Sequence, residues 1–524
     1  MDCPLSTRRM AALTLVALFS FSSRGNSADR PQWGESDSRN QVSAERGLVD
    51  SFEPGDRRRD GSGRIDIDTT KRVKWTAKLG DRAHGTPVVA GGRVFVGTNN
   101  NDPRDTRIQG DKGVLMCFSE QSGDFLWQLV VPKMYALKYS DWHNVGICSS
   151  PTVEGDKVYL VTNRCEVVCL DAKGMSDGND GPYQEEGRHM VVEGEQPLEP
   201  TEKDADIVWL YDMVAELDVF PHNASNCSIL LDGNLLYICT SNGVDWTHTR
   251  VVSPQAPTII VLDKTTGKLV ARDDFGIGGD IVHGQWSSPA LGRVGDRRLI
   301  CIGAGDACVY AFEALDPQTS PKKKPRNLKY VWKFNGEPLA QTQDNVPRDH
   351  QHDTNSYLVT AMPVFHDERV YVAITQEAYH RKMKGYLVCL DATLEGDVTR
   401  KAIKWTYEDT GASVSTVSVA DGLVYAADFA GRVHCLDAET GHCYWVYEAG
   451  NPVWGSTFVA DGKVYVGTGR YYFCVLKAGK KLEELARIRM RDGVLSTPTA
   501  ANGVLYVATN RHLYAIADDE HAAE

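Results

Sequence analysis

The amino-acid sequence predicts an all-β fold: an eight-bladed β-propeller with four-stranded antiparallel blades, closed by an N-terminal strand. Three observations predict this fold. A unit of alternating β-branched and aromatic residues recurs along the chain, and turns of the form Asp-x-x-Thr-Gly recur inside it. The repetitive region also begins and ends with complementary parts of one unit.

The repeat is clearest at 433–445, which reads Val-His-Cys-Leu-Asp-Ala-Glu-Thr-Gly-His-Cys-Tyr-Trp, and it returns in altered form at 115–127 and 261–268. Segments such as 86–97 and 456–467 lie between these copies and alternate apolar residues about a Gly-Gly or Asp-Gly turn. Each copy is therefore expected to form a four-stranded meander, with strands A to D. A lone meander cannot bury both of its faces, so the copies must stack.

The strands can be counted in two ways, and both counts give eight blades. The A strands begin near Thr86, Ser150, Cys227, Ser288, Met362, Thr416, Ser456 and Thr497. The D strands lie around Trp75, Trp127, Trp209, Val270, Trp332, Trp405, Trp445 and Leu485. The strand around Trp75 has no A–C unit before it, and the last A–C unit has no D strand after it. We therefore expect Trp75 to complete the last blade, which removes the exposed sheet edges. The tryptophans are expected to pack between blades.

The pattern Ala/Cys-x-Asp-x-x-Thr-Gly-x-x-x-Trp resembles the repeat of the PQQ-like (quinoprotein alcohol dehydrogenase-like) β-propeller family, named after pyrroloquinoline quinone (PQQ), and is similar to BamB-like repeats. The likeness covers residues 73–516 and is nearly complete around Trp445, while Ser119 alters it and Val270 and Leu485 replace the tryptophan. More narrowly, the chain resembles secreted planctomycete-type PQQ-binding-like propellers in segments 31–33, 177–181, 220–227, 241–248 and 283–289.

For an enzyme of this family, the resemblance implies PQQ and Ca²⁺ as cofactors, with a catalytic Asp, a Trp floor and often a vicinal disulfide. The sequence has no vicinal cysteine pair and no CxxCH motif for a c-type haem. No residue matches a dehydrogenase motif in context, so the catalytic residues stay unassigned. A shared fold does not imply a shared function.

The chain divides into a signal peptide at 1–28, an N-terminal extension at 29–72, the propeller at 73–516 and a C-terminal tail at 517–524. The signal is indicated by Arg8 and Arg9, which precede a short apolar run and small residues. We therefore expect an exported protein, periplasmic or extracellular, and no later apolar run is long enough for a transmembrane segment. The net charge of −13 and the absence of a basic stripe exclude a nucleic-acid partner.

The long insertions gather on one side of the predicted ring. In a meander, the D–A and B–C loops leave one face, named here the D–A/B–C face, and the A–B and C–D loops leave the other. The insertions at the D–A/B–C face are 99–112, 131–149, 212–226, 242–256, 335–361 and 376–384; those at the other face are 173–206 and 317–327.

Most of the fourteen histidines are expected at the D–A/B–C face, several of them just ahead of an innermost strand. Polar and aromatic groups in a concavity favour a ligand site. The residues expected at the channel mouth are His84, Trp142, His143, Asn144, His222, Asn223, Asn226, Asp245, Trp246, His248, His283, Gln285, Trp286, His352 and Trp454. Two alternatives stay open: each histidine hydrogen-bonds its own loop, or imidazoles bind a transition metal.

Two further groups of residues carry structural hypotheses. Asp177, Asn179 and Asp180 lie in a Gly-rich loop whose oxygens suit Ca²⁺, although turn formation alone also explains them. Cysteine pairs placed about their own turns predict cross-strand disulfides. These pairs are Cys227–Cys239, Cys301–Cys308 and Cys435–Cys443.

The function that the sequence favours is an exported scaffold that binds a ligand through the D–A/B–C face, without catalysis. The ligand class stays open between a small molecule, a glycan and a protein. The alternative is a PQQ-dependent (quinoprotein) oxidoreductase of alcohols or sugars. A third hypothesis is a glycan-acting hydrolase or lyase in which a histidine of the channel mouth is the general base.

Overall fold

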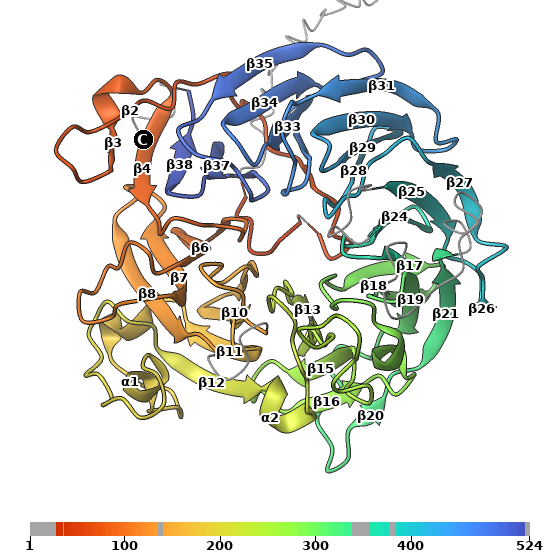
Figure 1. Ribbon diagram of the computed structural model, residues 1–524, viewed down its shortest axis with the longest axis horizontal. Helices are drawn as coiled ribbons and strands as arrows, with labels where there is room; N and C mark the ends of the chain where they lie inside the picture. Colours follow the sequence, from red (N-terminus) through yellow and green to blue (C-terminus); the bar gives the residue numbers. More distant parts are fainter. Residues whose placement is uncertain (1–27, 35, 135–139, 338–356, 377–383, 519–524) are drawn as a thin grey trace, which may run out of the picture.

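The computed structural model describes residues 28–34, 36–134, 140–337, 357–376 and 384–518, so the predicted signal peptide lies almost entirely outside the described residues. The described residues form a ring of eight sheets around a central axis (Figure 1). In seven blades, strand D follows strands A to C in the sequence. In the eighth blade, strand D comes from the N-terminal part of the chain. The predicted eight-bladed, all-β propeller is confirmed.

The first four blades follow the chain, each with strands A to D from the axis outwards. Blade 1 contains β5 (Val88–Ala90), β6 (Arg93–Asn99), β7 (Lys112–Ser119) and β8 (Phe125–Pro132). Blade 2 contains β9 (Thr152–Glu154), β10 (Lys157–Val161), β11 (Glu166–Asp171) and β12 (Ile207–Asp212). Blade 3 contains β13 (Leu230–Asp232), β14 (Leu235–Cys239), β15 (Ile259–Asp263) and β16 (Leu269–Arg272). Blade 4 contains β17 (Ala290–Val294), β18 (Arg297–Gly303), β19 (Cys308–Glu313) and β21 (Tyr330–Asn335).

The second four blades complete the ring. Blade 5 contains β22 (Tyr357–Leu358), β23 (Val364–His366), β24 (Arg369–Gln376), β25 (Gly385–Asp391) and β27 (Ile403–Tyr407). Blade 6 contains β28 (Ser418–Ala420), β29 (Leu423–Ala427), β30 (Arg432–Asp437) and β31 (Cys443–Glu448). Blade 7 contains β32 (Phe458–Ala460), β33 (Lys463–Gly467), β34 (Tyr472–Lys477) and β35 (Glu484–Arg489). Blade 8 contains β36 (Thr499–Ala501), β37 (Val504–Ala508), β38 (His512–Ile516) and β4 (Val73–Lys78).

The ring closes as the sequence predicts. Strand β4 pairs antiparallel with β38, and Trp75 lies opposite Ala515. The outermost strand of the last blade therefore comes from the start of the propeller region, so the two ends of the ring are held by a sheet ladder (Figure 1).

The D-strand tryptophans lock neighbouring blades together. The Trp405 indole donates a 3.0 Å hydrogen bond to the carbonyl of Ala438 in the next blade, and Trp445 donates a 2.9 Å bond to Gly479. The Asp-x-x-Thr-Gly turn supplies the surface on which the indole rests. Gly441 has φ +73°, and a Cβ there would lie 2.7 Å from the Trp405 ring. Glycine is required at this position both for its backbone conformation and for the close approach.

A ring of hydroxyl groups surrounds the channel at the starts of the A strands. The backbone N–H of one blade donates to a Ser or Thr hydroxyl of the next. The donor–acceptor pairs are Thr86–Ser150, Ser150–Ser228, Ser228–Ser288, Met362–Thr416, Thr416–Ser456, Ser456–Thr497 and Thr497–Thr86. Methionine at 362 interrupts the series, because it offers no hydroxyl to blade 4. The other links satisfy polar groups where the blades crowd together.

The described residues of the N-terminal extension up to 50, which are 28–34 and 36–50, cross the channel and are named here the plug (Figure 1, red-orange). The backbone of Arg30 exchanges two hydrogen bonds with Val89, and further plug carbonyls accept bonds from inner strands of blades 2, 4, 5 and 7. Strand β1 (Val42–Ser43) runs parallel to β32. The plug also bonds the A–B turns at Gly91 and Asp461. It therefore fills the end of the channel opposite the D–A/B–C face.

Arg39 anchors the plug inside the ring. Its guanidinium is fully buried and donates 2.8 Å hydrogen bonds to the carbonyls of Trp33, Ser228 and Pro289. Burial lowers the pKa of Arg39 to about 10, so the group remains a cation at neutral pH. These charge-assisted bonds tie the plug to blades 3 and 4.

The remaining elements decorate the ring. They are β2 (Asp56–Arg57), β3 (Ile65–Asp66), β20 (Arg326–Asn327), β26 (Gly396–Asp397), α1 (Glu186–His189), α2 (Met213–Leu217), and the 3₁₀ turns η1 (Ile67–Thr69), η2 (Gly174–Asp177) and η3 (Ile277–Asp280). Strands β20 and β26 lie in C–D loops and each extends the outer edge of the preceding blade. Among the described residues, no helix has the length and apolar character that a membrane span needs.

None of the three predicted disulfides is formed in the structure, where all six cysteines are free thiols. The strand register explains two of the pairs: Cys301 lies opposite Ala311, and Cys435 lies opposite Trp445. In the third pair, the Cys227 sulfur accepts a hydrogen bond from the backbone N–H of Cys239. The prediction assumed that two cysteines spaced symmetrically about a turn lie opposite each other. That assumption ignored the length of the turn and the bulge in β30.

Candidate functional site

The channel opens at the D–A/B–C face into a pocket with a volume of about 520 Å³. Trp33 of the plug is part of its lining, so the plug limits the depth of the pocket. Aromatic rings and a methionine line much of the rest: Trp142, Trp286, Phe429, Trp454 and Met362. The hydroxyls of Thr86, Ser150, Ser228, Thr360, Thr416, Ser456 and Thr497 also line it. The result is a largely apolar concavity whose walls carry neutral polar groups and one cation, Arg82.

Seven of the residues predicted for the channel mouth line this pocket. They are His84, Trp142, Asn223, Asn226, His283, Trp286 and Trp454. Trp142 and Trp454 are 38% and 46% exposed, so both side chains lie at the rim of the pocket. The other predicted residues lie beside the pocket or elsewhere on the face, and His352 lies outside the described residues.

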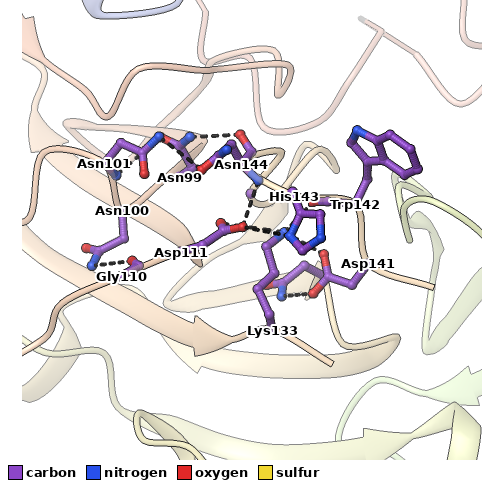
Figure 2. A network of polar contacts seen from close by, with 12 residues as sticks. Asn99, Asn100, Asn101, Gly110, Asp111, Lys133, Asp141, Trp142, His143 and Asn144 are labelled. Carbon is purple, nitrogen blue, oxygen red and sulfur yellow. Dashed lines mark hydrogen bonds and ion pairs between the residues drawn. The ribbon is translucent and has the colours of Figure 1, made fainter. Parts of the chain in front are cut away.

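Trp142 is held in place by its backbone. The Lys133 ammonium donates a 2.8 Å hydrogen bond to the Trp142 carbonyl, and the Trp142 N–H donates a 2.7 Å bond to the Asn223 carbonyl. Lys133 also forms a buried 2.6 Å ion pair with Asp141 (Figure 2). Burial raises the pKa of Asp141, although Lys133 opposes this effect. Asp141 therefore acts in positioning the loop, and its carboxylate does not line the pocket.

His143 and Asn144 belong to the same network (Figure 2), and neither is among the residues that line the pocket. The Asn144 N–H donates a 2.7 Å bond to Asp111, and the Asn99 amide donates a 2.8 Å bond to the Asn144 carbonyl. The His143 ring lies 4.0 Å from Asp111 and is 58% exposed. These two predicted residues thus stabilise the loop that carries Trp142 and do not line the pocket.

His84 and Trp454 form an aromatic wall of the pocket. Their ring centroids lie 6.1 Å apart in an edge-on arrangement, and Phe429 packs 4.8 Å from Trp454. Burial lowers the pKa of His84 to about 4, and the nearby Arg82 adds to this effect. His84 is therefore a neutral imidazole at physiological pH.

Three histidines converge at one edge of the pocket. His222 and His283 come from the D–A loops before β13 and β17, and His248 comes from the B–C loop of blade 3. One ring nitrogen of each lies within 4.8 Å of the others. His222 and His283 are buried, His248 is exposed, and His283 also lines the pocket. The structure therefore brings these three of the predicted residues together.

The remaining predicted residues have local partners. Gln285 is buried and hydrogen-bonds to the backbone of Gly303 and Gly305, so it connects the D–A loop before β17 to the end of β18. Asp245 accepts hydrogen bonds from Thr247 within its own turn. Trp246 is 63% exposed and is not among the residues that line the pocket.

The predicted Ca²⁺ loop is held by protein contacts. Asp177 forms a 2.8 Å ion pair with Lys173, and this contact lowers the pKa of Asp177. The Asn179 amide donates to Glu186 and accepts from Gln184, each at 2.8 Å. Asp180 lies beside them. Turn and ion-pair chemistry account for these contacts, and Ca²⁺ binding stays a prediction.

Several pocket residues were not identified from the sequence. Trp33 lies outside the repeats, Arg82 lies in the D–A loop before β5, and Phe429 lies in a short B–C loop without an insertion. The hydroxyl ring did leave a signal, because Ser or Thr stands at most of the predicted A-strand starts. The path of the plug left no such signal in the sequence, because residues 28–50 contain no internal repeat.

The comparisons with known proteins agree with the fold. The family model described as outer membrane protein assembly factor BamB matches residues 59–176, 334–447 and 383–482, together about half of the chain. A search of the curated proteins gives no match.

Three solved structures show the same architecture. BamB from Moraxella catarrhalis is 13% identical, with a TM-score of 0.50 over 85% of this chain and 97% of that chain. Quinohemoprotein alcohol dehydrogenase from Comamonas testosteroni is 14% identical, with a TM-score of 0.58 over 94% and 81%. A europium-containing methanol dehydrogenase is 11% identical, with a TM-score of 0.57 over 92% and 89%. At these identities the likeness shows the fold alone.

Proposed function

Because the chain belongs to the PQQ-like β-propeller family with BamB-like repeats, we propose that it is an exported binding propeller whose pocket receives a small, uncharged ring compound such as a sugar. The composition of the pocket carries this proposal. Its described lining residues include four tryptophans and many hydroxyls, one cationic side chain, Arg82, and no carboxylate. Its volume of about 520 Å³ is in the range of small-molecule sites.

A sugar ring has an apolar C–H face and a hydroxyl edge, and the pocket offers partners for both. The exposed rings of Trp142 and Trp454 are flat apolar surfaces at the rim, and Trp33 is a third at the plug. Large aromatic side chains supply contact area at little cost in conformational entropy. A hydroxyl that accepts a bond in the ring, such as Thr416 Oγ1, keeps its own proton as a donor.

The described residues do not fit PQQ. PQQ carries three carboxylates, and a dehydrogenase of this family holds Ca²⁺ beside it with acidic ligands. The described lining has only Arg82 to balance three negative charges and no Asp or Glu to bind Ca²⁺. A buried anion without cationic partners is strongly disfavoured. The quinoprotein alternative is therefore the weaker hypothesis.

Isothermal titration of the full mature chain with neutral mono- and disaccharides tests the proposal. We expect at least one sugar to bind, with an affinity that falls about 10-fold or more in Trp142→Ala and in Trp454→Ala. Phe275→Ala is the matched control, since its ring is 45% exposed and does not line the pocket.

The same titration with PQQ and Ca²⁺ separates the two hypotheses. No PQQ binding is expected. Tight PQQ binding accompanied by dye reduction with an alcohol would overturn the proposal, and so would the failure of every neutral sugar to bind.

A further inference from the structure

The three converging histidines form a compact group that the binding pocket itself does not require. The ring centroids lie 4.6 Å apart for His222–His283 and His248–His283, and 4.8 Å apart for His222–His248. His222 Nε2 and His248 Nε2 are separated by only 3.1 Å. Among the described residues, this is the one group of His, Cys, Asp or Glu found with metal-ligand spacing.

The loops that carry the three histidines are joined by backbone hydrogen bonds. The Val244 N–H donates a 2.9 Å bond to the His283 carbonyl, and the Gln285 N–H donates a 2.9 Å bond to the Asn242 carbonyl. Gly243 lies at the centre of this crossing. A Cβ there would lie 2.6 Å from the Cβ of His222 and 2.7 Å from the His283 carbonyl oxygen, so only glycine lets the three loops approach this closely.

The hydrogen bonding of His222 fixes its tautomer. Its Nδ1 lies 2.8 Å from the Val244 carbonyl oxygen, which can only accept, so Nδ1 carries the proton. The Nε2 lone pair therefore faces His248. Metal-binding histidines commonly have this arrangement, in which a backbone carbonyl takes the proton of one nitrogen and orients the other.

Asn223 gives His283 a comparable partner. Its side-chain amide lies 3.2 Å from His283 Nε2, with Nδ2 nearer and Oδ1 buried without a hydrogen-bond partner among the described residues. Turning the amide over would let Oδ1 accept the His283 Nε2 proton, which would satisfy the buried oxygen. His283 would then have the same partner chemistry as His222.

We propose that His222, His248 and His283 bind one divalent transition-metal ion of the Zn²⁺ class, with a further coordination position open towards the pocket. Two nitrogens on a tetrahedral Zn²⁺, each at about 2.0–2.1 Å, lie about 3.3 Å apart, close to the 3.1 Å between His222 and His248. The widest separation of 4.8 Å must close by about 1.5 Å. His283 lines the pocket, so a ligand or water there can reach the metal.

The positions of the three side chains suit this role in different ways. His222 and His283 are buried and oriented, while His248 is exposed and has a left-handed backbone conformation, φ +59°. Histidine is among the few residues other than glycine that adopt this conformation. An exposed third ligand can swing onto an ion that the two buried rings have already bound.

Zinc binding by the metal-free full chain tests the inference. We expect one Zn²⁺ per chain by isothermal titration, and Co²⁺ in its place should give the visible absorption of a tetrahedral ion. His248→Asn should weaken Zn²⁺ binding by about 100-fold or more without changing the thermal midpoint in the absence of metal, because the side chain is exposed and asparagine also adopts the left-handed backbone conformation. His283→Asn is the second variant.

His143→Ala is the matched control, since it removes an exposed histidine of the same face outside the group, and it should bind Zn²⁺ like the wild type. The inference is overturned if the wild type binds no Zn²⁺, or if His248→Asn and His283→Asn both bind it unchanged. Trp142→Ala, which should lose sugar, should keep Zn²⁺, so the failure of either proposal can be recognised separately.

Discussion

The two ends of the central channel are built by the same eight blades, yet one end is filled and the other is open. At the A–B/C–D end, the plug bonds the inner strands, and Arg39 satisfies three carbonyls from a fully buried position. At the D–A/B–C end, long loops surround a pocket lined by aromatic rings and hydroxyls. The repeat therefore determines the ring, while departures from the repeat determine what each end of the channel can do.

The largest expected effect comes from breaking the filled end. Arg39→Leu should lower the free energy of unfolding by about 3–5 kcal/mol, because three buried carbonyls lose their charged donor. Chemical denaturation measures this change. The exposed Arg46 of the same segment provides the control, and Arg46→Leu should be nearly neutral. Equal effects from the two substitutions would show that the plug is not anchored through Arg39.

At the open end, Lys133 is the residue that supports the pocket rim. Lys133→Met should cost about 3 kcal/mol in unfolding free energy, since Asp141 loses a buried partner. It should also weaken sugar binding, because the Trp142 carbonyl loses its donor. Lys173→Met breaks an exposed ion pair and should change neither quantity measurably. Unchanged sugar affinity in Lys133→Met would contradict the positioning role.

His84 predicts an acid sensitivity of the open end. Burial lowers its pKa to about 4 from an ordinary value near 6.5, so the unfolded chain binds more protons between these values. The contribution of His84 to stability is complete above pH 6.5 and is lost as the pH falls towards 4, by at most about 3 kcal/mol. His84 is partly exposed, which reduces this figure.

The measurement is the unfolding free energy of wild type and His84→Gln at pH 7 and pH 4.5. The wild type should lose more stability than the variant between the two pH values. Identical losses would mean that His84 is solvated in the folded protein.

The smallest expected effect concerns the hydroxyl ring between the two ends. Thr416→Val keeps the side-chain shape but leaves the Met362 N–H without its acceptor, and should cost about 1–2 kcal/mol. Thr265→Val, at an exposed turn, is the control. Thermal denaturation of the two variants distinguishes a stabilising ring from an incidental alignment.

The sequence predicted the regular part of the molecule well. The period of two, the turn glycines and the unpaired strand at Trp75 specified the blades and their closure, because each depends on local residues. The same reasoning failed for Cys435 and Cys443, where a bulge shifts the register between β30 and β31. Such a shift depends on how two strands meet and has no signature in spacing.

The functional site was only partly predictable for a related reason. The D–A/B–C face was recognised from its insertions, but the direction of each side chain depends on contacts between loops. His222, His248 and His283 converge because their loops hydrogen-bond to one another, whereas His143 turns towards Asp111. Trp33 reaches the pocket from a segment far outside the repeats. Contacts between distant segments of this kind leave no pattern within either segment.

The most direct test of the difference between the two ends is a crystal structure of the protein with the tightest-binding neutral sugar from the titration. We predict the sugar ring in the central pocket, stacked on Trp142 or Trp454, with the plug unmoved and Trp33 beneath it. A sugar bound at the A–B/C–D face, or one that displaces the plug to enter the channel, would contradict the account.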